Sequence, residues 1–183
     1  MAEPLGVYIS VPFCRAKCTY CNFASGVFGA ERMDAYVDRV CAEIARAPDR
    51  AVGIGAELPR RVDSVYLGGG TPSLLNANQV QRLFAALRAE FQVQNGAEIT
   101  LECAPGQMSE ETLETLLGAG MNRVSLGVQS FVDAEARAVG RLHTREICMR
   151  EILRLRGAGI EDINIDLIVG LPGQTAASWR ESV

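Results

Sequence analysis

The chain has 183 residues, of which 48% are apolar and 22% are charged, and its formal net charge is −4. These proportions match those of folded globular proteins and exclude a disordered chain. The length allows one domain with a sizeable core. The acidic balance argues against a nucleic-acid-binding surface, so no nucleic-acid partner is expected.

The sequence predicts neither a membrane segment nor a secreted protein. The nearest candidate for a transmembrane segment, residues 163–169, is far too short to span a bilayer and contains Asn164 and Asp166. The first residues lack the basic start and the small-residue cleavage site of a signal peptide. Six cysteines in a chain of this length do not resemble a disulfide scaffold. We therefore expect a cytoplasmic protein.

Strand-like and helix-like patterns alternate along the chain. Runs that are β-branched or alternate in polarity predict strands at residues 6–11, 62–67, 98–103, 123–128 and 162–169. Apolar residues at helical spacing predict helices at residues 31–47, 79–91, 110–117, 144–156 and 176–183. Asn76 and Gln79 predict a capping box for the second helix. Residues 48–61 are expected to form a surface connection.

This alternation predicts an α/β protein with a parallel sheet and right-handed crossovers. A flat doubly wound sheet and a curved (β/α) barrel both satisfy the pattern. A weak internal repeat supports the βα unit, because residues 118–126 and 157–165 both begin with Gly-Ala-Gly and continue into a predicted strand. The sequence stops partway into the fifth predicted helix, so we expect further strands and helices in a longer protein.

Three cysteines follow the first predicted strand at C-x3-C-x2-C spacing: Cys14, Cys18 and Cys21. Three thiolates can hold three irons of a [4Fe–4S] cluster and leave the fourth iron open. Arg15 and Lys17 within the same loop favour the thiolate forms. A structural zinc site is the alternative, but a fourth Cys or His at a usual zinc spacing is missing. The motif therefore favours a cluster at the carboxyl end of the sheet, where α/β folds keep their active sites.

Candidate ligand-contacting residues also follow the other predicted strands. The Gly-Gly-Gly-Thr-Pro-Ser run at residues 68–73 allows close backbone approach to a ligand, although a tight turn explains it equally well. Glu102 ends the third strand, where a carboxylate can bind a hydroxyl pair or an amine. Asp166 on the fifth strand is expected to be buried and to need a partner, for which Arg141 and a neighbouring backbone group are the candidates.

The other distinctive side chains are interpreted as structural. His143, the only histidine, is expected at the surface. Cys41 and Cys148 occupy apolar positions of predicted helices and are expected to pack in the core. Cys103 follows Glu102 but lies outside the three-cysteine motif, so we do not expect it to be a ligand.

Several motifs occur in a specific order along nearly the whole chain. They are the three cysteines, residues 68–72 (Gly-Gly-Gly-Thr-Pro), residues 126–131 (Leu-Gly-Val-Gln-Ser-Phe), Gly140 and Arg141 with His143, and residues 164–172 (Asn-Ile-Asp-Leu-Ile-Val-Gly-Leu-Pro). Together they resemble the radical S-adenosylmethionine (radical SAM) proteins of the coproporphyrinogen dehydrogenase group. That family uses a [4Fe–4S] cluster and S-adenosylmethionine, which is cleaved to methionine and a 5′-deoxyadenosyl radical.

The resemblance implies a fold and a set of site residues. The fold is a partial (β/α)6 TIM-like barrel of the radical SAM type, truncated within or after the fifth βα unit. Residues 1–183 would form an incomplete core domain, with a C-terminal domain absent. Cys14, Cys18 and Cys21 would hold the cluster, and Tyr8 and Tyr20 would flank the cofactor site. The residues implied to contact S-adenosylmethionine are Gly69, Gly70, Thr71, Glu102, Gln129, Arg141 and Asp166.

One position separates two branches of this family. The oxygen-independent coproporphyrinogen dehydrogenases carry a further cysteine two residues after the third, where this chain has Phe23. The chain therefore resembles the HemW branch, which is thought to deliver haem to respiratory proteins, and the radical decarboxylase that forms protoporphyrinogen is the alternative. Whether the protein is an enzyme stays open. Haem or a porphyrinogen, a haem-accepting protein and a flavodoxin- or ferredoxin-like reductant are the implied partners.

Overall fold

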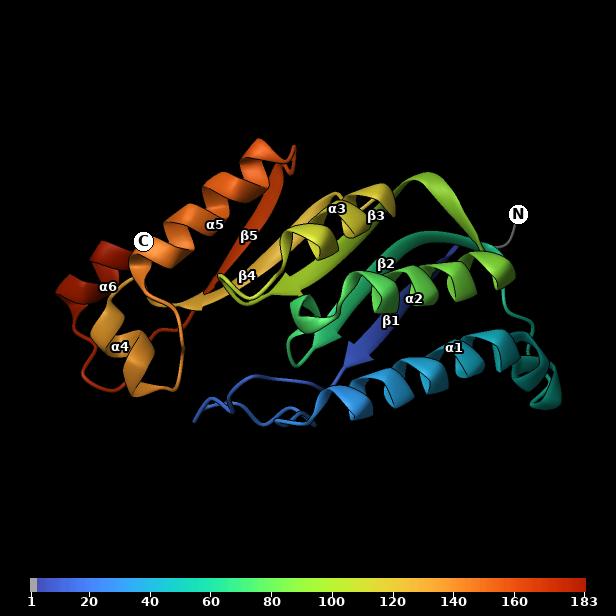
Figure 1. Cartoon of the computed structure of the whole chain (residues 1–183), viewed down its shortest axis with the longest axis horizontal. Helices are drawn as coiled ribbons and strands as arrows, with labels where there is room; N and C mark the ends of the chain where they lie inside the picture. The colour runs from blue at the N-terminus through green and yellow to red at the C-terminus, as the bar shows by residue number, and fades with distance from the viewer. Residues whose placement is uncertain (1–2) are drawn as a thin grey trace.

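The computed structural model describes residues 3–183, which form one parallel sheet with helices (Figure 1). The strands are β1 (Leu5–Val11), β2 (Arg61–Gly69), β3 (Gln92–Cys103), β4 (Arg123–Gln129) and β5 (Asp162–Leu167). They are hydrogen-bonded in the order β1-β2-β3-β4-β5, and every pair is parallel. A doubly wound sheet reverses its strand order at a switch point, and this sheet does not. The order is that of an arc of a (β/α) barrel, as predicted.

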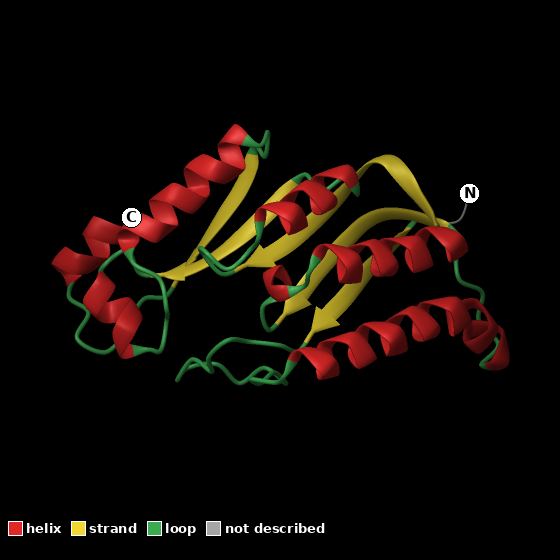
Figure 2. Cartoon of the chain, viewed as in Figure 1, coloured by secondary structure: helices red, strands yellow, loops and turns green. Residues whose placement is uncertain are grey.

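The long helices lie on one side of the sheet (Figure 2). They are α1 (Ala30–Gly53), α2 (Ala77–Glu90), α3 (Glu110–Gly118) and α5 (Arg145–Gly157). Two short helices, α4 (Asp133–Ala138) and α6 (Ala176–Ser182), lie beyond the ends of β4 and β5, and a 3-10 turn, η1 (Pro72–Leu74), follows β2 (Figure 1). Among residues 3–183, no helix is both long enough and apolar enough to cross a bilayer.

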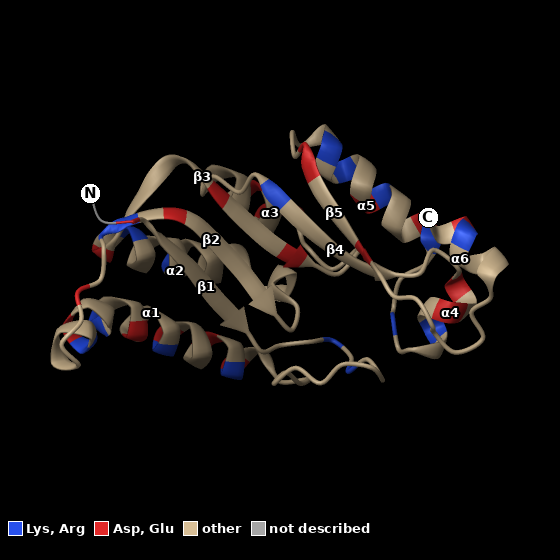
Figure 3. Ribbon diagram, turned by 180° about the vertical axis from the view of Figure 1, so that it is seen from behind, with Lys and Arg blue, Asp and Glu red and all other residues tan. Residues whose placement is uncertain are grey.

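Alternation along the strands determines which face of the sheet is buried. Val65 and Leu67 of β2, Leu101 of β3, and Val124 and Leu126 of β4 are each at most 1% exposed beneath the helices. The residues between them point to the opposite face. Figure 3 views the sheet from that side, with the helices behind it, and shows charged residues along β2, β3, β4 and β5. Parallel sheets are usually apolar on both faces, so a polar face fits the inside of a barrel that holds a polar ligand.

Several element boundaries differ from the sequence-based predictions. Helix α1 extends to Gly53 and includes Pro48, so the first six residues of the predicted connection at residues 48–61 are helical. Strand β5 ends at Leu167 rather than at 169. Helix α4 and the η1 turn were not predicted, because short elements carry too little periodicity. The capping box of α2 is confirmed by reciprocal hydrogen bonds between Asn76 and Gln79.

Candidate functional site

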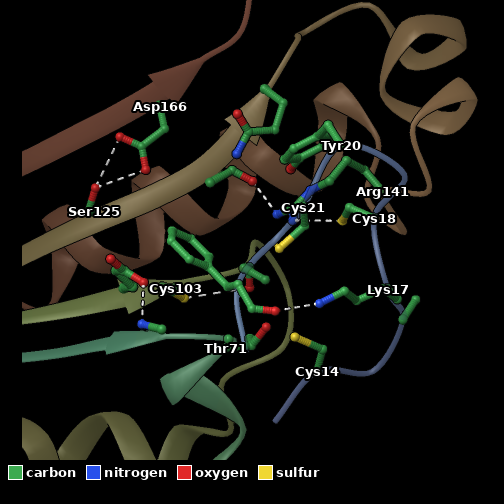
Figure 4. A pocket seen from close by; sticks show the side chains of 18 residues that line it. Cys14, Lys17, Cys18, Tyr20, Cys21, Thr71, Cys103, Ser125, Arg141 and Asp166 are labelled. Atoms are coloured by element: carbon green, nitrogen blue, oxygen red, sulfur yellow. Dashed lines mark hydrogen bonds between the residues drawn. The ribbon is translucent and has the colours of Figure 1, made fainter. Parts of the chain in front are cut away.

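A cavity of about 250 Å³ lies at the carboxyl ends of the strands, where the loop after β1 faces the ends of β2, β3, β4 and β5 (Figure 4). Every predicted site residue except Tyr8 lines this cavity. These are Cys14, Cys18, Tyr20, Cys21, Gly69, Gly70, Thr71, Glu102, Gln129, Arg141 and Asp166. Parallel strands place their carboxyl ends at one edge of a sheet, which brings together motifs that are up to 152 residues apart (Cys14 to Asp166).

The three cysteines lie on the cluster loop, which we define as residues 14–25. No helix or strand forms there, and hydrogen bonds from Cys14 N to Gly26 O (2.9 Å) and from Gly26 N to Pro12 O (3.0 Å) join the two ends of the loop just after β1. All three thiols are partly exposed and free. Within residues 3–183, no three His, Cys, Asp or Glu side chains are close enough to hold a single metal ion. Three thiols are soft ligands that suit an iron–sulfur cluster, in which each would hold a different iron.

Arg141 joins the cluster loop to β4. Its Nη1 lies 3.6 Å from the Sγ of Cys18, and its Nη2 donates to the carbonyl of Gly127. Its Nε is buried and has no hydrogen-bond partner within residues 3–183. A buried, unsatisfied N–H is costly unless a ligand fills it. The unpaired Nε–H of Arg141 can therefore donate to the carboxylate of an amino-acid ligand. Guanidinium groups bind carboxylates through parallel hydrogen bonds.

Glu102 is held by two donors at the end of β3. Its Oε1 accepts from the Tyr66 hydroxyl (3.1 Å), and its Oε2 accepts from Gly69 N (2.9 Å). Burial raises the pKa of Glu102, and these two hydrogen bonds oppose that shift. Both oxygens are oriented by groups from β2, so the carboxylate is positioned to accept a further donor from a ligand, such as an amine.

The glycine run combines a turn with close backbone packing. Gly69 has φ of +109°, which side chains rarely allow. A Cβ on Gly70 would lie 2.6 Å from Phe13 O and 2.8 Å from Val11 O, so only glycine lets β2 end against β1 and the cluster loop. Thr71 follows and lines the cavity. The run is a structural turn, one of the two predicted alternatives, and it also forms part of the cavity wall.

Gln129 adopts a left-handed backbone conformation at the end of β4. Its φ of +72° is the only positive φ of a non-glycine residue within residues 3–183. The pairing of β4 with β5 shifts register between Gly127 and Gln129, as at a β-bulge. Strained backbone conformations of this kind are common at ligand-binding sites, where they orient a side chain toward the ligand. Here the conformation places Gln129 in the cavity wall.

Asp166 differs from its predicted environment. It is exposed at the edge of the sheet rather than buried. Its carboxylate accepts from Ser125 Oγ (3.1 Å) and from Asn164 Nδ2 (2.7 Å), whereas Arg141 turns to Gly127 and Cys18 (Figure 4). The predicted pairing of Asp166 with Arg141 is therefore wrong. Neutral donors from the same polar face therefore satisfy the carboxylate. The inward position of Ser125 on β4 could have indicated this pairing from the sequence.

Tyr8 lies outside the cavity lining. Its side chain is 60% exposed on the open face of β1 and stacks on Tyr66, with ring centroids 5.6 Å apart. Tyr66 in turn donates to Glu102, so Tyr8 contacts the cavity residues only through Tyr66. Tyr66 was missed by the sequence analysis, although it occupies an inward position between Val65 and Leu67. Burial and the charge of Glu102 raise the pKa of Tyr66 to about 12, which keeps its hydroxyl protonated as a donor.

His143 is buried, and the expectation of a surface position is wrong. It is 6% exposed, and its Nε2 donates to the carbonyl of Val128 (3.0 Å). Burial, followed by the nearby charge of Arg141, lowers the pKa of His143 to about 4, so the ring is neutral at pH 7. A neutral ring bonded to β4 fixes the segment that carries Arg141. His143 lies outside any helix or strand, so no periodic pattern in the sequence indicated that it is buried.

The other cysteines match their structural interpretation. Cys148 is fully buried in α5, and Cys41 is partly buried in α1. Cys103 contributes to the cavity wall, but the residue is only 4% exposed and its thiol donates to Ala104 O (3.5 Å). Burial raises the pKa of Cys103 to about 12, which disfavours the thiolate that a metal ligand requires. That Cys103 is not a ligand stays a prediction.

Comparison with known proteins connects this arrangement to a family. The family model described as the Radical SAM superfamily matches residues 8–183, which include all three cysteines and every other cavity-lining residue. The chain belongs to the Radical SAM superfamily. The fold, the [4Fe–4S] cluster and S-adenosylmethionine that the sequence motifs implied are therefore confirmed at the level of the family.

Similar relatives within the Radical SAM superfamily fall into two classes. The chain is 37% identical to the haem chaperone HemW of Lactococcus lactis over 183 residues, covering 100% of this chain and 46% of that protein. It is also 37% identical to the oxygen-independent coproporphyrinogen III oxidase of Bradyrhizobium diazoefficiens, covering 97% of this chain and 38% of that protein. Identity does not separate the two classes, and the chain spans less than half the length of either relative.

A solved structure confirms the architecture. Coproporphyrinogen III oxidase (HemN) from Escherichia coli, described as a radical SAM enzyme, superposes with a TM-score of 0.82 and 33% sequence identity. The match covers 98% of this chain and 40% of that one. The five-stranded sheet of this chain therefore has the same fold as the matching 40% of that radical SAM enzyme.

Proposed function

We propose that this chain is the cofactor-binding part of a haem-metabolism protein of the HemW type, which carries haem to acceptor proteins. Phe23 carries this proposal. Its side chain is 61% exposed and lines the cavity two residues after Cys21, where the decarboxylase branch has a further cysteine. A phenyl ring cannot supply a thiol, so the cavity lacks a residue that the decarboxylase branch has at this position.

In this proposal, residues of the cavity hold the two cofactors in fixed orientations. Cys14, Cys18 and Cys21 would hold the cluster, which supplies the electron for cleavage of S-adenosylmethionine. Arg141 would bind the carboxylate of that nucleotide through its free Nε, and Glu102 would accept from its amino group. The Arg141 guanidinium lies 3.6 Å from the thiol of Cys18, so the amino-acid end of the nucleotide would face the cluster (Figure 4).

The oxygen-independent coproporphyrinogen oxidase is the second candidate, and the comparisons favour it as strongly as the first. A relative of that class has the same 37% identity, and the solved structure of HemN superposes over 98% of this chain. Such an enzyme would need the same cluster, nucleotide and reductant. We assign haem, a haem-accepting protein and a flavodoxin- or ferredoxin-like reductant to the chaperone proposal, and a porphyrinogen substrate with the same reductant to the oxidase.

One assay separates the two candidates. The full-length protein, reconstituted with iron and sulfide, is incubated anaerobically with a reductant, S-adenosylmethionine and coproporphyrinogen, and separately with haem. Stable haem binding without porphyrinogen turnover is the expected result. Formation of protoporphyrinogen would reject the chaperone proposal. Phe23→Cys is expected to gain no decarboxylase activity, because one thiol does not supply the rest of a substrate site, and strong activity in this variant would contradict that reasoning.

A further inference from the structure

Lys17 stands out because it is the one lysine among the 18 Lys and Arg residues of the chain. It lies on the cluster loop between Cys14 and Cys18 and lines the cavity. A charged residue of this kind at a loop position is usually exchangeable between lysine and arginine when only its charge matters. The contacts of Lys17 therefore decide whether this position requires lysine rather than arginine.

The Lys17 ammonium uses all three of its N–H groups within the loop. Its Nζ donates to Phe23 O (2.7 Å), Ser25 O (2.9 Å) and Ser25 Oγ (3.3 Å). Three acceptors around one nitrogen match a tetrahedral ammonium with three donors, whereas the flat guanidinium fork of arginine directs its donors within one plane. The geometry thus explains why this position is lysine.

These hydrogen bonds close the loop around two of the cluster ligands. Cys18 and Cys21 both lie between Lys17 and its acceptors at residues 23 and 25, so the contacts join the two ends of the segment that carries them. The other bonds of that segment are isolated ones: Cys21 N donates to Cys18 O (3.2 Å), Thr19 N donates to Val139 O (3.2 Å) and Ser25 N donates to Phe23 O (2.7 Å). The Cys18 thiol also contacts Arg141 Nη1 (3.6 Å) and Gly140 O (3.9 Å), whereas no hydrogen bond within residues 3–183 holds the Cys21 thiol. Without regular secondary structure, the directions of the two thiols depend on such ties.

The charge of Lys17 is also not neutralised by a carboxylate. Its partners are uncharged oxygens, and no ion pair within residues 3–183 involves it. Arg15 offers the same charge in the same loop, but its side chain makes no hydrogen bond or ion pair within residues 3–183.

We propose that Lys17 is a positioning residue for the iron–sulfur cluster, and that it acts by closing the cluster loop through three hydrogen bonds from its ammonium group. The inference rests on the cluster that is part of the proposed function, and on neither haem nor porphyrinogen. It predicts that lysine geometry is required and that a positive charge alone is insufficient.

Three variants of the full chain test this requirement. Lys17→Met removes the charge and the contacts, Lys17→Arg keeps the charge and loses the three-point contact, and Arg15→Met is the matched control that removes a charge without a hydrogen bond. After anaerobic reconstitution, loss of cluster absorbance to an iron chelator is followed over time. We expect both Lys17 variants to lose the cluster about tenfold faster than wild type, and Arg15→Met to behave like wild type.

Each other outcome overturns the inference. Wild-type rates in both Lys17 variants would show that the contacts do not matter. A wild-type rate in Lys17→Arg with fast loss in Lys17→Met, or equal loss in Arg15→Met and Lys17→Met, would show that charge alone acts.

A second measurement does not require the cluster. Lys17 carries the one side-chain amine of the chain, so reductive methylation followed by peptide mapping reports its accessibility directly. In the folded chain without iron, we expect methylation of Lys17 at least tenfold slower than in urea, because the Nζ is held by three acceptors. Equal rates would overturn the inference. If wild type bound no cluster at all, the proposed function would fail, and the methylation rates would still decide whether Lys17 closes the loop.

Discussion

The guanidinium of Arg141 lies against the thiol of Cys18, with Nη1 3.6 Å from Sγ, although 123 residues separate them in the sequence. The segment after β4 therefore contacts the cluster loop directly, and one residue connects the predicted iron ligands to the predicted nucleotide site. Gly127 allows this contact, since a Cβ there would come within 3.3 Å of Arg141 Nη2.

Arg141→Lys is expected to weaken binding of S-adenosylmethionine by at least tenfold, or about 1.4 kcal/mol. Lysine presents its donors from a single nitrogen, whereas the planar guanidinium spreads five donors over three nitrogens that reach Cys18, Gly127 and a bound carboxylate together. Equilibrium binding to the reconstituted chain measures the effect. Arg137→Lys on the exposed side of α4 is the control. Unchanged affinity in Arg141→Lys would remove the assigned role of the guanidinium.

Replacement of any one of Cys14, Cys18 and Cys21 by alanine is expected to abolish the brown absorbance of the reconstituted chain, because two thiolates cannot hold three irons of the cluster. Iron and sulfide contents, measured together with the visible spectrum, check the result. Cys41→Ala, on α1 and away from the cavity, should keep the full absorbance. Full occupancy in any of the three loop variants would mean that the ligand set is wrong.

Gly70→Ala is expected to lower the free energy of unfolding by roughly 1–3 kcal/mol, because overpacked sites must shift their surroundings. Its Cβ would lie 2.6 Å from the backbone oxygen of Phe13, and backbone cannot move aside as a flexible side chain can. Urea denaturation measures the change. In Gly118→Ala, the new Cβ meets no atom within 4 Å at the end of α3, so this control should be neutral or slightly stabilised. Equal stability of the two variants would contradict the packing argument.

Gln129→Gly is expected to weaken binding of S-adenosylmethionine while leaving the fold intact or more stable. Glycine adopts the φ of +72° without the strain that glutamine carries, a difference of about 1 kcal/mol. The side chain that lines the cavity is lost in the same substitution. Urea denaturation and nucleotide binding are measured on the same sample. A large loss of stability would show that the Gln129 side chain is needed for folding.

Acid is expected to destabilise the chain through His143. The folded-state pKa of about 4 lies below the ordinary value of 6.5, so the unfolded state binds the proton more readily between these values. The stabilisation from the neutral ring is therefore complete above pH 6.5 and is lost as the pH falls to about 4, by roughly 3 kcal/mol in total. Urea denaturation of the chain without iron across this range measures the loss.

His143→Gln provides the comparison for this pH dependence. Glutamine can donate to Val128 O as the ring does, but it does not titrate. The charged groups that influence His143 are Arg141, which lowers its pKa, and Asp133, which raises it, and both are retained in the variant. From pH 7 to pH 4, the unfolding free energy of wild type should therefore fall by roughly 3 kcal/mol relative to that of His143→Gln. A constant difference would contradict the burial argument.

The sequence alone determined the parts of this protein that depend on local spacing. Alternation along the strands and helical periodicity located all five strands and the longer helices, because a buried face leaves its period in neighbouring residues. The C-x3-C-x2-C spacing and the glycine run were recognisable for the same reason, since a short loop fixes which residues can act together. The ends of the elements were less certain, as α1 shows by continuing through Pro48 to Gly53.

Only the tertiary structure decided how distant residues meet. It paired Asp166 with Ser125 and Asn164 rather than with Arg141, and it buried His143 against the carbonyl of Val128 on β4. It also revealed that Lys17 spans the cluster loop. These contacts depend on the register and curvature of strands that are remote in the chain, and no local period in the sequence encodes such long-range geometry.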